Sequence, residues 1–377
     1  MNILMLDLVG QYNKIKAQVD AGIQKVIASA AFVNGPQVKE FASQLGAYLS
    51  VKNVIPCANG TDALQIALMA LDLQPGDEII VPCFTYAATT EVIALLKLQP
   101  VMVEVDADTF NITAELVEAA ITPKTKAIVP VHLYGQCVDM GPLLKLAEKY
   151  NLYVIEDAAQ ALGAEYTFSD GRIAKAGTMG DIGCTSFFPS KNLGCYGDGG
   201  ALFTNNETLA EKIKMIANHG QQKKYYHEIV GVNSRLDTIQ AAILGIKLQY
   251  LDDYARTRNV VAETYDKAFK ELEWLETPAR VMNSDHVFHQ YTLKLKNASD
   301  RDLLKSHLEM AGIPSMIYYP LPLHLQPAFK QEGLEKGAFP VSEDLCTKVL
   351  SLPVHTEMTD EQLTYIIDTL NSFKKGN

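Results

Sequence analysis

The feature that most constrains the fold is the alternation of short apolar runs with helical patterns between about residues 54 and 217. The expected strands are Val54–Cys57, Ile79–Pro82, Val101–Val105, Ala127–Val131, Leu152–Ile155, Thr185–Phe188 and Ala201–Thr204. The expected helices among them are Ala63–Leu71, Glu91–Leu98, Gly141–Tyr150 and Leu209–Ala217. Continuous apolar strands separated by helices predict an α/β fold with a mainly parallel sheet, covered by helices on both faces.

Helical patterns flank this region. Two apolar stripes, ending at Ile27 and at Leu49, predict helices on either side of Asn34-Gly35-Pro36. A long helical pattern, with room for a break, covers about Ser234 to Phe269. The elements expected after Trp274 are a strand near Tyr291–Leu295, a helix near Asp302–Ala311 and a closing helix at Asp360–Phe373. We therefore predict a large domain, residues 1–250, and a small α+β domain, residues 251–377.

Composition limits the partners of the chain. The 377 residues carry a formal net charge of -11, whereas nucleic-acid binding needs a dense basic surface. The six cysteines are scattered without a Cys-x-x-Cys pair, so we expect reduced thiols rather than disulfides or zinc ligands. No apolar run approaches the ~20 residues that cross a bilayer. The N-terminus also lacks the basic start of a signal peptide, so we expect a cytoplasmic protein.

Two predicted strands end in reactive residues, at the edge where doubly wound sheets bind ligands. Glu156 and Asp157 follow Leu152–Ile155. A carboxylate there can hold the proton of a pyridinium nitrogen, and the plain alternative is a helix cap or a solvated acid. Lys191 follows Thr185–Phe188 in a polar, glycine-rich turn. Desolvation would make its amine a nucleophile, although a single lysine is more often a solvated surface residue.

A third motif, Asn59-Gly60-Thr61, follows Val54–Cys57 and opens a helix. The free amides of a helix start bind phosphate, and the alternative is that Thr61 is a plain N-cap. Each of the three motifs is weak alone. Their order along the chain (phosphate turn, strand-end acid, post-strand lysine) fits one site for pyridoxal 5'-phosphate (PLP) better than three accidents.

Five motifs occur in order across the predicted large domain. They are CANGTDAL at 57–64, PCFTYAAT at 82–89, EDAAQ at 156–160, SFFPSK at 186–191 and GVNSR at 231–235. With them, nearly the whole chain resembles the DegT/DnrJ/StrS-type sugar aminotransferases, which are fold-type I PLP enzymes. The resemblance implies a mainly parallel seven-stranded sheet between helices, a smaller C-terminal α+β domain, and a homodimer with active sites at the subunit interface.

The resemblance also implies a role for each matching residue. Lys191 would be the catalytic lysine that forms a Schiff base with the cofactor, and Asp157 would pair with its pyridine nitrogen. Gln160 would reach the phenolic oxygen, and Tyr86 would stack on the ring.

The phosphate group has its own set of residues in the family. The resemblance places Gly60, Thr61 and Ser186 there, together with Asn233 of the other subunit. The plain alternative for Asn233 is a helix N-cap.

The resemblance extends to enzymes that aminate UDP-2-acetamido-2-deoxy-3-oxo-glucuronate, with L-glutamate as the usual donor, for bacterial surface polysaccharides such as lipopolysaccharide O-antigen. It implies that Arg235 pairs with a substrate carboxylate or phosphate. Tyr318 and Tyr319 are further substrate-binding candidates, and Tyr318 stands where that subgroup has His. A 4-keto-deoxy nucleotide sugar is the alternative acceptor.

Three rival functions remain open. A pyridoxamine-phosphate (PMP)-dependent sugar dehydratase would carry His in place of Lys191. A nicotinamide oxidoreductase rests on the glycines at 194, 197, 199 and 200, whose spacing is not Gly-x-Gly-x-x-Gly. A non-catalytic PLP-binding regulator is disfavoured by the acidic charge and the missing DNA-binding segment. His286 and His289 lack an evident third ligand and suggest a strand-edge pair, so no metal is expected.

Overall fold

The computed structural model describes residues 2–374. Within them, a seven-stranded sheet has the order β1-β9-β8-β5-β4-β2-β3. Its strands are β1 (Asn53–Cys57), β2 (Glu78–Pro82), β3 (Gln99–Val103), β4 (Thr125–Ile128), β5 (Tyr153–Asp157), β8 (Ile182–Ser186) and β9 (Gly200–Thr204). Neighbouring strands from β8 to β3 run parallel, and β9 is antiparallel to both β8 and β1. The predicted α/β class and mainly parallel sheet are confirmed.

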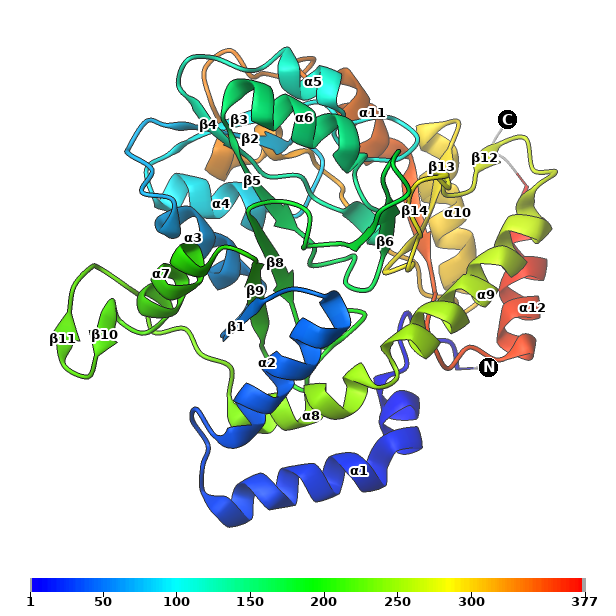
Figure 1. Ribbon diagram of the computed structural model, residues 1–377. Helices are drawn as coiled ribbons and strands as arrows, with labels where there is room; N and C mark the ends of the chain where they lie inside the picture. The colour runs from blue at the N-terminus through cyan, green and yellow to red at the C-terminus, as the bar shows by residue number, and fades with distance from the viewer. Residues whose placement is uncertain (1, 375–377) are drawn as a thin grey trace.

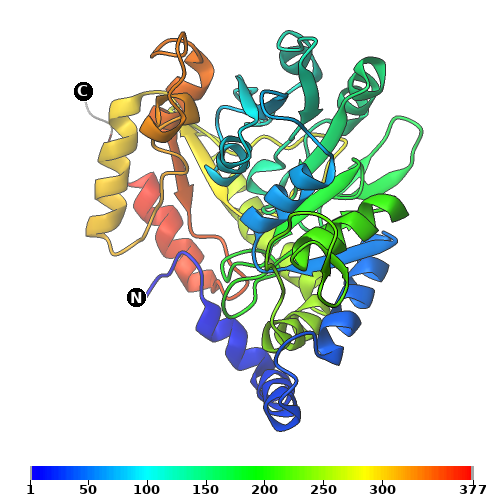
Figure 2. The same ribbon diagram turned by 90° about the vertical axis from the view of Figure 1, so that its left-hand side faces the viewer.

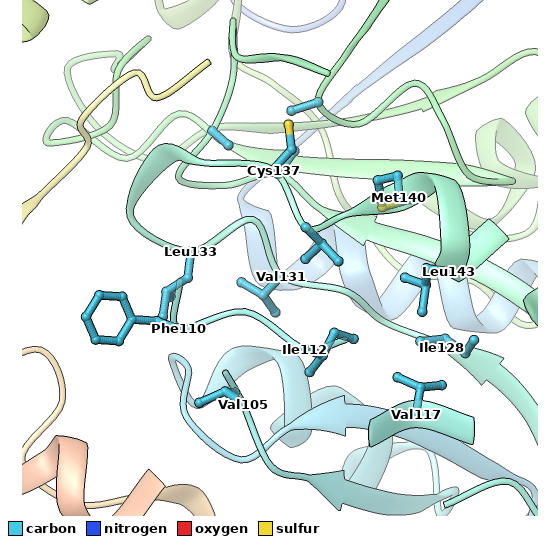
Figure 3. Packing of buried hydrophobic residues seen from close by; sticks show 14 of the residues in the cluster. Val105, Phe110, Ile112, Val117, Ile128, Val131, Leu133, Cys137, Met140 and Leu143 are labelled. Atoms are coloured by element: carbon cyan, nitrogen blue, oxygen red, sulfur yellow. The ribbon is translucent and has the colours of Figure 1, made fainter. Parts of the chain in front are cut away.

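Side chains alternate between the two faces along each strand. Both faces of the sheet are apolar, and helices cover both. Ile79 and Val81 of β2 pack on one side with buried residues of α3 (Gly60–Ala70), α4 (Ala88–Leu95) and α7 (Glu207–Ala217). Ile80 packs on the other side, in a cluster that includes Val117 of α5 and Leu143 of α6 (Figure 3). The remaining helices of this region are α1 (Leu8–Ser29), α2 (Pro36–Leu49), α5 (Ala114–Glu118), α6 (Met140–Tyr150) and α8 (Thr238–Leu248).

The C-terminal elements lie to one side of this sheet (Figures 1 and 2). They are α9 (Leu251–Phe269), β12 (Leu275–Glu276), β13 (Tyr291–Leu295), α10 (Ala298–Met310), α11 (Pro340–Lys348), β14 (Val349–Leu352) and α12 (Asp360–Asn371). The long helical pattern is broken between Leu248 and Leu251. A separate core forms after the break, and Ile3 of the N-terminal segment joins it. We propose that the small domain begins near residue 251, with Ile3 as an outlying part of it.

Two short hairpins were not predicted from the sequence. One is β6 (Glu165–Thr167) with β7 (Ile173–Lys175), and the other is β10 (Gln221–Lys223) with β11 (Tyr226–His227). The β10–β11 hairpin projects from the body of the molecule beyond α7 (Figure 1). Strands of two or three mostly exposed residues have no apolar alternation to detect. Among residues 2–374, no helix has the length and apolar character needed to span a membrane.

Candidate active site

A cavity of about 690 Å³ lies at the carboxyl ends of the parallel strands. Residues that end or follow β1, β2, β4, β5 and β8 line it. The structure therefore brings together nine residues that the sequence had singled out: Gly60, Thr61, Tyr86, Asp157, Gln160, Ser186, Lys191, Tyr318 and Tyr319. Asn233 and Arg235 are not part of its lining.

Lys191 reaches the cavity from a tightly held turn. Its own backbone N–H donates to the Phe188 carbonyl at 2.8 Å, and the buried Asn192 side chain donates to the Val287 carbonyl at 3.1 Å. The amine forms no hydrogen bond or salt bridge with any described residue. Burial lowers the pKa of Lys191 to about 8, while the nearby Asp157 carboxylate acts in the opposite direction. At pH 7 roughly a tenth of this amine is therefore uncharged, far more than for an ordinary lysine, and the uncharged form can act as a nucleophile.

The two acids of the Glu156-Asp157 pair have different environments, because successive residues of a strand face opposite ways. Glu156 is fully buried away from the cavity. It accepts hydrogen bonds from His132 Nε2 at 2.8 Å and from the backbone N–H of Met179 and Gly180 at 2.6 Å each. Asp157 ends β5 and lines the cavity, with 7% of its surface exposed. Asp157 is thus the acid that a ligand in the cavity meets.

The Asp157 carboxylate has one protein donor on each oxygen. Thr89 Oγ1 donates to Oδ2 at 2.9 Å, and the Ala159 backbone N–H donates to Oδ1 at 3.2 Å. A carboxylate offers about four lone-pair positions. Acceptor capacity therefore remains for a group that enters the cavity.

The start of α3 forms one wall of the cavity. Asn59 is the N-cap, since its side chain accepts from the Asp62 N–H at 2.8 Å; the alternative that Thr61 is the N-cap is wrong. The backbone N–H groups of Gly60 and Thr61 have no partner among the described residues. A Cβ atom on Gly60 would lie 2.7 Å from the Cβ of Ser186, so only glycine allows α3 to approach β8 this closely. Free amides at a helix N-terminus suit a phosphate group.

Polar and aromatic side chains close the other wall. Gln160 Oε1 accepts from the Tyr134 N–H at 2.8 Å, and Gln160 Nε2 donates to the Tyr319 hydroxyl at 3.1 Å. Burial raises the pKa of Tyr319 well above its ordinary value, which keeps its phenol neutral. Tyr86 is 61% exposed, and its ring centre is 6.3 Å from that of Tyr319. Tyr318 is half-buried beside them, and its carbonyl accepts from the Tyr134 hydroxyl.

The five sequence motifs do not include His289, which also lines the cavity. Burial, with the positive charges of Lys191 and Arg258, holds the pKa of His289 well below its usual range, so the imidazole is neutral. The expected strand-edge pair with His286 is wrong, because neither residue belongs to a strand. Across residues 2–374 there is no cluster of three metal-ligating side chains. His289 lies two residues before β13, and its only sequence signal was the His-x-x-His spacing.

The cavity fits a PLP molecule. Its lining combines an unpaired amine, a carboxylate with acceptor capacity and two free helix-start amides. It also contains two buried polar atoms, Thr85 Oγ1 and His289 Nδ1, that have no hydrogen-bond partner among the described residues. Buried polar groups are normally satisfied, so orphan atoms on a cavity wall indicate a polar ligand.

Asn233 and Arg235 lie outside the cavity. Asn233 is exposed and forms an isolated bridge with Asn218, at the base of the projecting hairpin. It is not a helix N-cap, because α8 begins at Thr238 with Asp237 as its N-cap. Arg235 is half-buried. Neither residue joins the cavity of its own chain.

Comparisons with known proteins agree with this geometry. Residues 13–371 match the model of the DegT/DnrJ/EryC1/StrS aminotransferase family. A UDP-2-acetamido-2-deoxy-3-oxo-D-glucuronate aminotransferase of Pseudomonas aeruginosa is 46% identical, over 98% of this chain and 100% of that protein. A protein of Geobacillus stearothermophilus named as a pleiotropic regulatory protein is 45% identical over 99% of each chain.

The three-dimensional fold also matches those of solved structures. A crystal structure of Streptomyces venezuelae DesV in complex with a ketimine intermediate matches with a TM-score of 0.93 and 39% identity, over 98% of this chain and 97% of that one. Other structures with this fold hold PMP or PLP, in accord with the predicted cofactor. The resemblance seen in the five motifs is confirmed, and the chain belongs to the DegT/DnrJ/EryC1/StrS aminotransferase family.

Proposed function

We propose that this protein transfers an amino group from L-glutamate to UDP-2-acetamido-2-deoxy-3-oxo-glucuronate, in the cytoplasm, for a bacterial surface polysaccharide such as lipopolysaccharide O-antigen. The observation that carries the proposal is that Lys191 and Asp157 line one cavity beside the free N-terminus of α3. The full-length identity of 46% to the Pseudomonas aeruginosa enzyme supports the choice of acceptor.

The enzyme uses PLP, and different cavity residues would contact different parts of the cofactor. When bound, PLP supplies an aldehyde that condenses with amines and a protonated ring that accepts the electron pair of a broken C–H bond. Asp157 would hold the ring nitrogen proton. Gly60, Thr61 and Ser186 would hold the phosphate.

The ring has two further contacts in this proposal. Gln160 Nε2 donates one hydrogen to Tyr319 and keeps a second for the phenolic oxygen. Tyr86, exposed on the cavity wall, would cover one face of the ring.

Lys191 would carry the proton. The pKa of about 8 leaves part of its Nζ atoms neutral. Neutral Nζ would accept the α-proton of the amino donor and later return a proton to the carbon that the cofactor aldehyde supplies. A group that acts first as base and then as acid works best with a pKa near the working pH. Its lack of a salt bridge leaves the amine free to move between these positions.

A second copy of the chain would complete the site. Asn233 and Arg235 lie outside the cavity of their own chain, beside the projecting hairpin. The hairpin exposes apolar surface at Tyr225 and Tyr226, and the segment after it does so at Val230, which is typical of a surface that a partner covers. In the homodimer, Asn233 would reach the phosphate of the neighbouring subunit, and Arg235 would pair with the substrate carboxylate. Tyr318 and Tyr319 would contact the sugar from the cavity side.

Two measurements test this function. The purified protein is expected to show a visible absorption band that glutamate shifts, and the Lys191→Ala protein should fold normally but lose transamination. Protein loaded with PMP is then offered a panel of 3-keto and 4-keto nucleotide sugars. Return of the visible band with the 3-oxo-glucuronate compound supports the proposal. Return only with a 4-keto-deoxy sugar identifies the alternative acceptor.

A regulatory function is the second candidate, because the Geobacillus stearothermophilus relative is named as a regulatory protein. A regulator would show the visible band without turnover of glutamate. The unpaired Lys191 amine, with its lowered pKa, favours catalysis, since a binding protein has no need of a reactive base. A PMP-dependent dehydratase is disfavoured by Lys191 itself, because those relatives carry His at this position.

A further inference from the structure

Thr89 contacts the functional carboxylate from outside the cavity. It is the second residue of α4 and is 1% exposed. Its hydroxyl donates to Asp157 Oδ2 at 2.9 Å, across 68 positions of sequence. Thr89 is not among the residues that line the cavity, and its hydroxyl is directed at Asp157. Any influence it has on the reaction must pass through Asp157.

The orientation of Asp157 depends on such a contact. The last torsion of an aspartate side chain has broad, roughly two-fold minima and does not set the plane of the carboxylate by itself. The Ala159 N–H holds Oδ1 at 3.2 Å, and the Thr89 hydroxyl holds Oδ2. Two donors on different oxygens define the plane, which determines where the remaining lone pairs point. Hydrogen bonds to a carboxylate are also stronger than those between neutral groups.

The neighbouring Thr90 shows that this contact is specific. Thr90 is 0% exposed, and its Oγ1 atom has no hydrogen-bond partner among the described residues. Successive residues of an α-helix point about 100° apart, so only one of the two hydroxyls can reach β5. The pair is therefore an internal comparison between a buried hydroxyl with a partner and one without.

We propose that Thr89 is a positioning residue, which fixes the Asp157 carboxylate so that a free lone pair meets the proton of the cofactor ring nitrogen. The inference rests on the proposed role of Asp157. Loss of the hydroxyl would let the carboxylate turn and weaken its hold on the protonated ring. Thr89→Val removes the hydroxyl at nearly constant shape, Thr89→Ser keeps it, and Thr90→Val is the matched control.

The test observes the ring nitrogen directly. Each purified variant is reconstituted with PLP that carries ¹⁵N in the ring, and the nitrogen resonance is recorded by NMR together with the PLP dissociation constant. We expect Thr89→Val to move the resonance toward the unprotonated position and to weaken PLP binding by roughly tenfold or more, the scale of one hydrogen bond to a charged group. Thr89→Ser and Thr90→Val should match the wild type.

Asp157→Asn separates the two possible failures. If this variant leaves the ¹⁵N resonance unchanged, Asp157 is not the partner of the ring nitrogen, and the proposed function has failed at that point. If Asp157→Asn moves the resonance and Thr89→Val does not, Thr89 does not position the carboxylate. Thr89→Ala provides a second hydroxyl-free variant should Thr89→Val not fold, and the same two outcomes apply to it.

Discussion

The proposal of a shared active site predicts that two inactive variants restore each other when they form mixed dimers. Lys191→Ala removes the amine from one cavity, and Arg235→Ala removes a residue that lies outside its own cavity. Each homodimer has two defective sites. In a mixed dimer, one site lacks both residues, whereas the other combines Lys191 of one subunit with Arg235 of its partner and is intact.

The size of the recovery follows from counting. Random pairing of equal amounts makes about half of the dimers mixed, and one of their two sites works, so activity should be about one quarter of the wild type. The Arg235→Ala homodimer should retain at most about 3% of wild-type kcat/KM, because truncating one partner of a charge pair that the bound substrate buries costs about 2–5 kcal/mol. About 25% is therefore well separated from the background.

The assay co-refolds the two variants and measures transamination at low acceptor concentration. The matched control mixes Lys191→Ala with Asp157→Asn. Both residues line the same cavity of one chain, so no arrangement of subunits yields an intact site and no recovery is expected. Recovery in the control would mean that subunits reassemble in some other way. Absence of recovery with Arg235→Ala, although mixed dimers are present, would refute the shared site.

Three further predictions concern single residues. In the apoprotein, the extent of Lys191 labelling by an amine-specific reagent, measured by mass spectrometry, should rise with pH and reach its midpoint near pH 8, because burial lowers the pKa and only the neutral amine reacts. A midpoint near pH 10.5, the ordinary value, would show a solvated lysine. Gly60→Ala should weaken PLP binding by about 1–3 kcal/mol, measured by titration, since the added Cβ meets Ser186 at 2.7 Å; unchanged affinity would contradict the close approach of α3. Glu156→Gln should lower the free energy of unfolding by about 3 kcal/mol in denaturant, because the buried carboxylate accepts from His132 and three backbone N–H groups; a loss below about 0.5 kcal/mol would contradict this network.

Elements with strong local signals were predictable from the sequence. The strand at Tyr291–Leu295 was predicted at its observed bounds, because its apolar residues and flanking signals are local. The long pattern from Ser234 to Phe269 left the position of its break open, since neither glycine nor proline marks the break at Gln249 and Tyr250. The β10–β11 hairpin gave no signal, because its strands are only two or three mostly exposed residues long and show neither helical nor strand periodicity. Local periodicity thus locates elements that bury a face and misses those that do not.

The candidate site shows the same division at the level of single residues. Lys191 and Asp157 could be singled out because each follows an apolar strand, and the parallel sheet brings such ends to one edge. Alternation along β5 requires Glu156 and Asp157 to face opposite sides, but the side that becomes the cavity depends on the packing of helices elsewhere in the chain. Thr89 and His289 reach the site from distant segments, and no local pattern distinguishes Thr89 from Thr90. The residues that react leave a local trace in the sequence, whereas the residues that orient them are defined by contacts that exist only after folding.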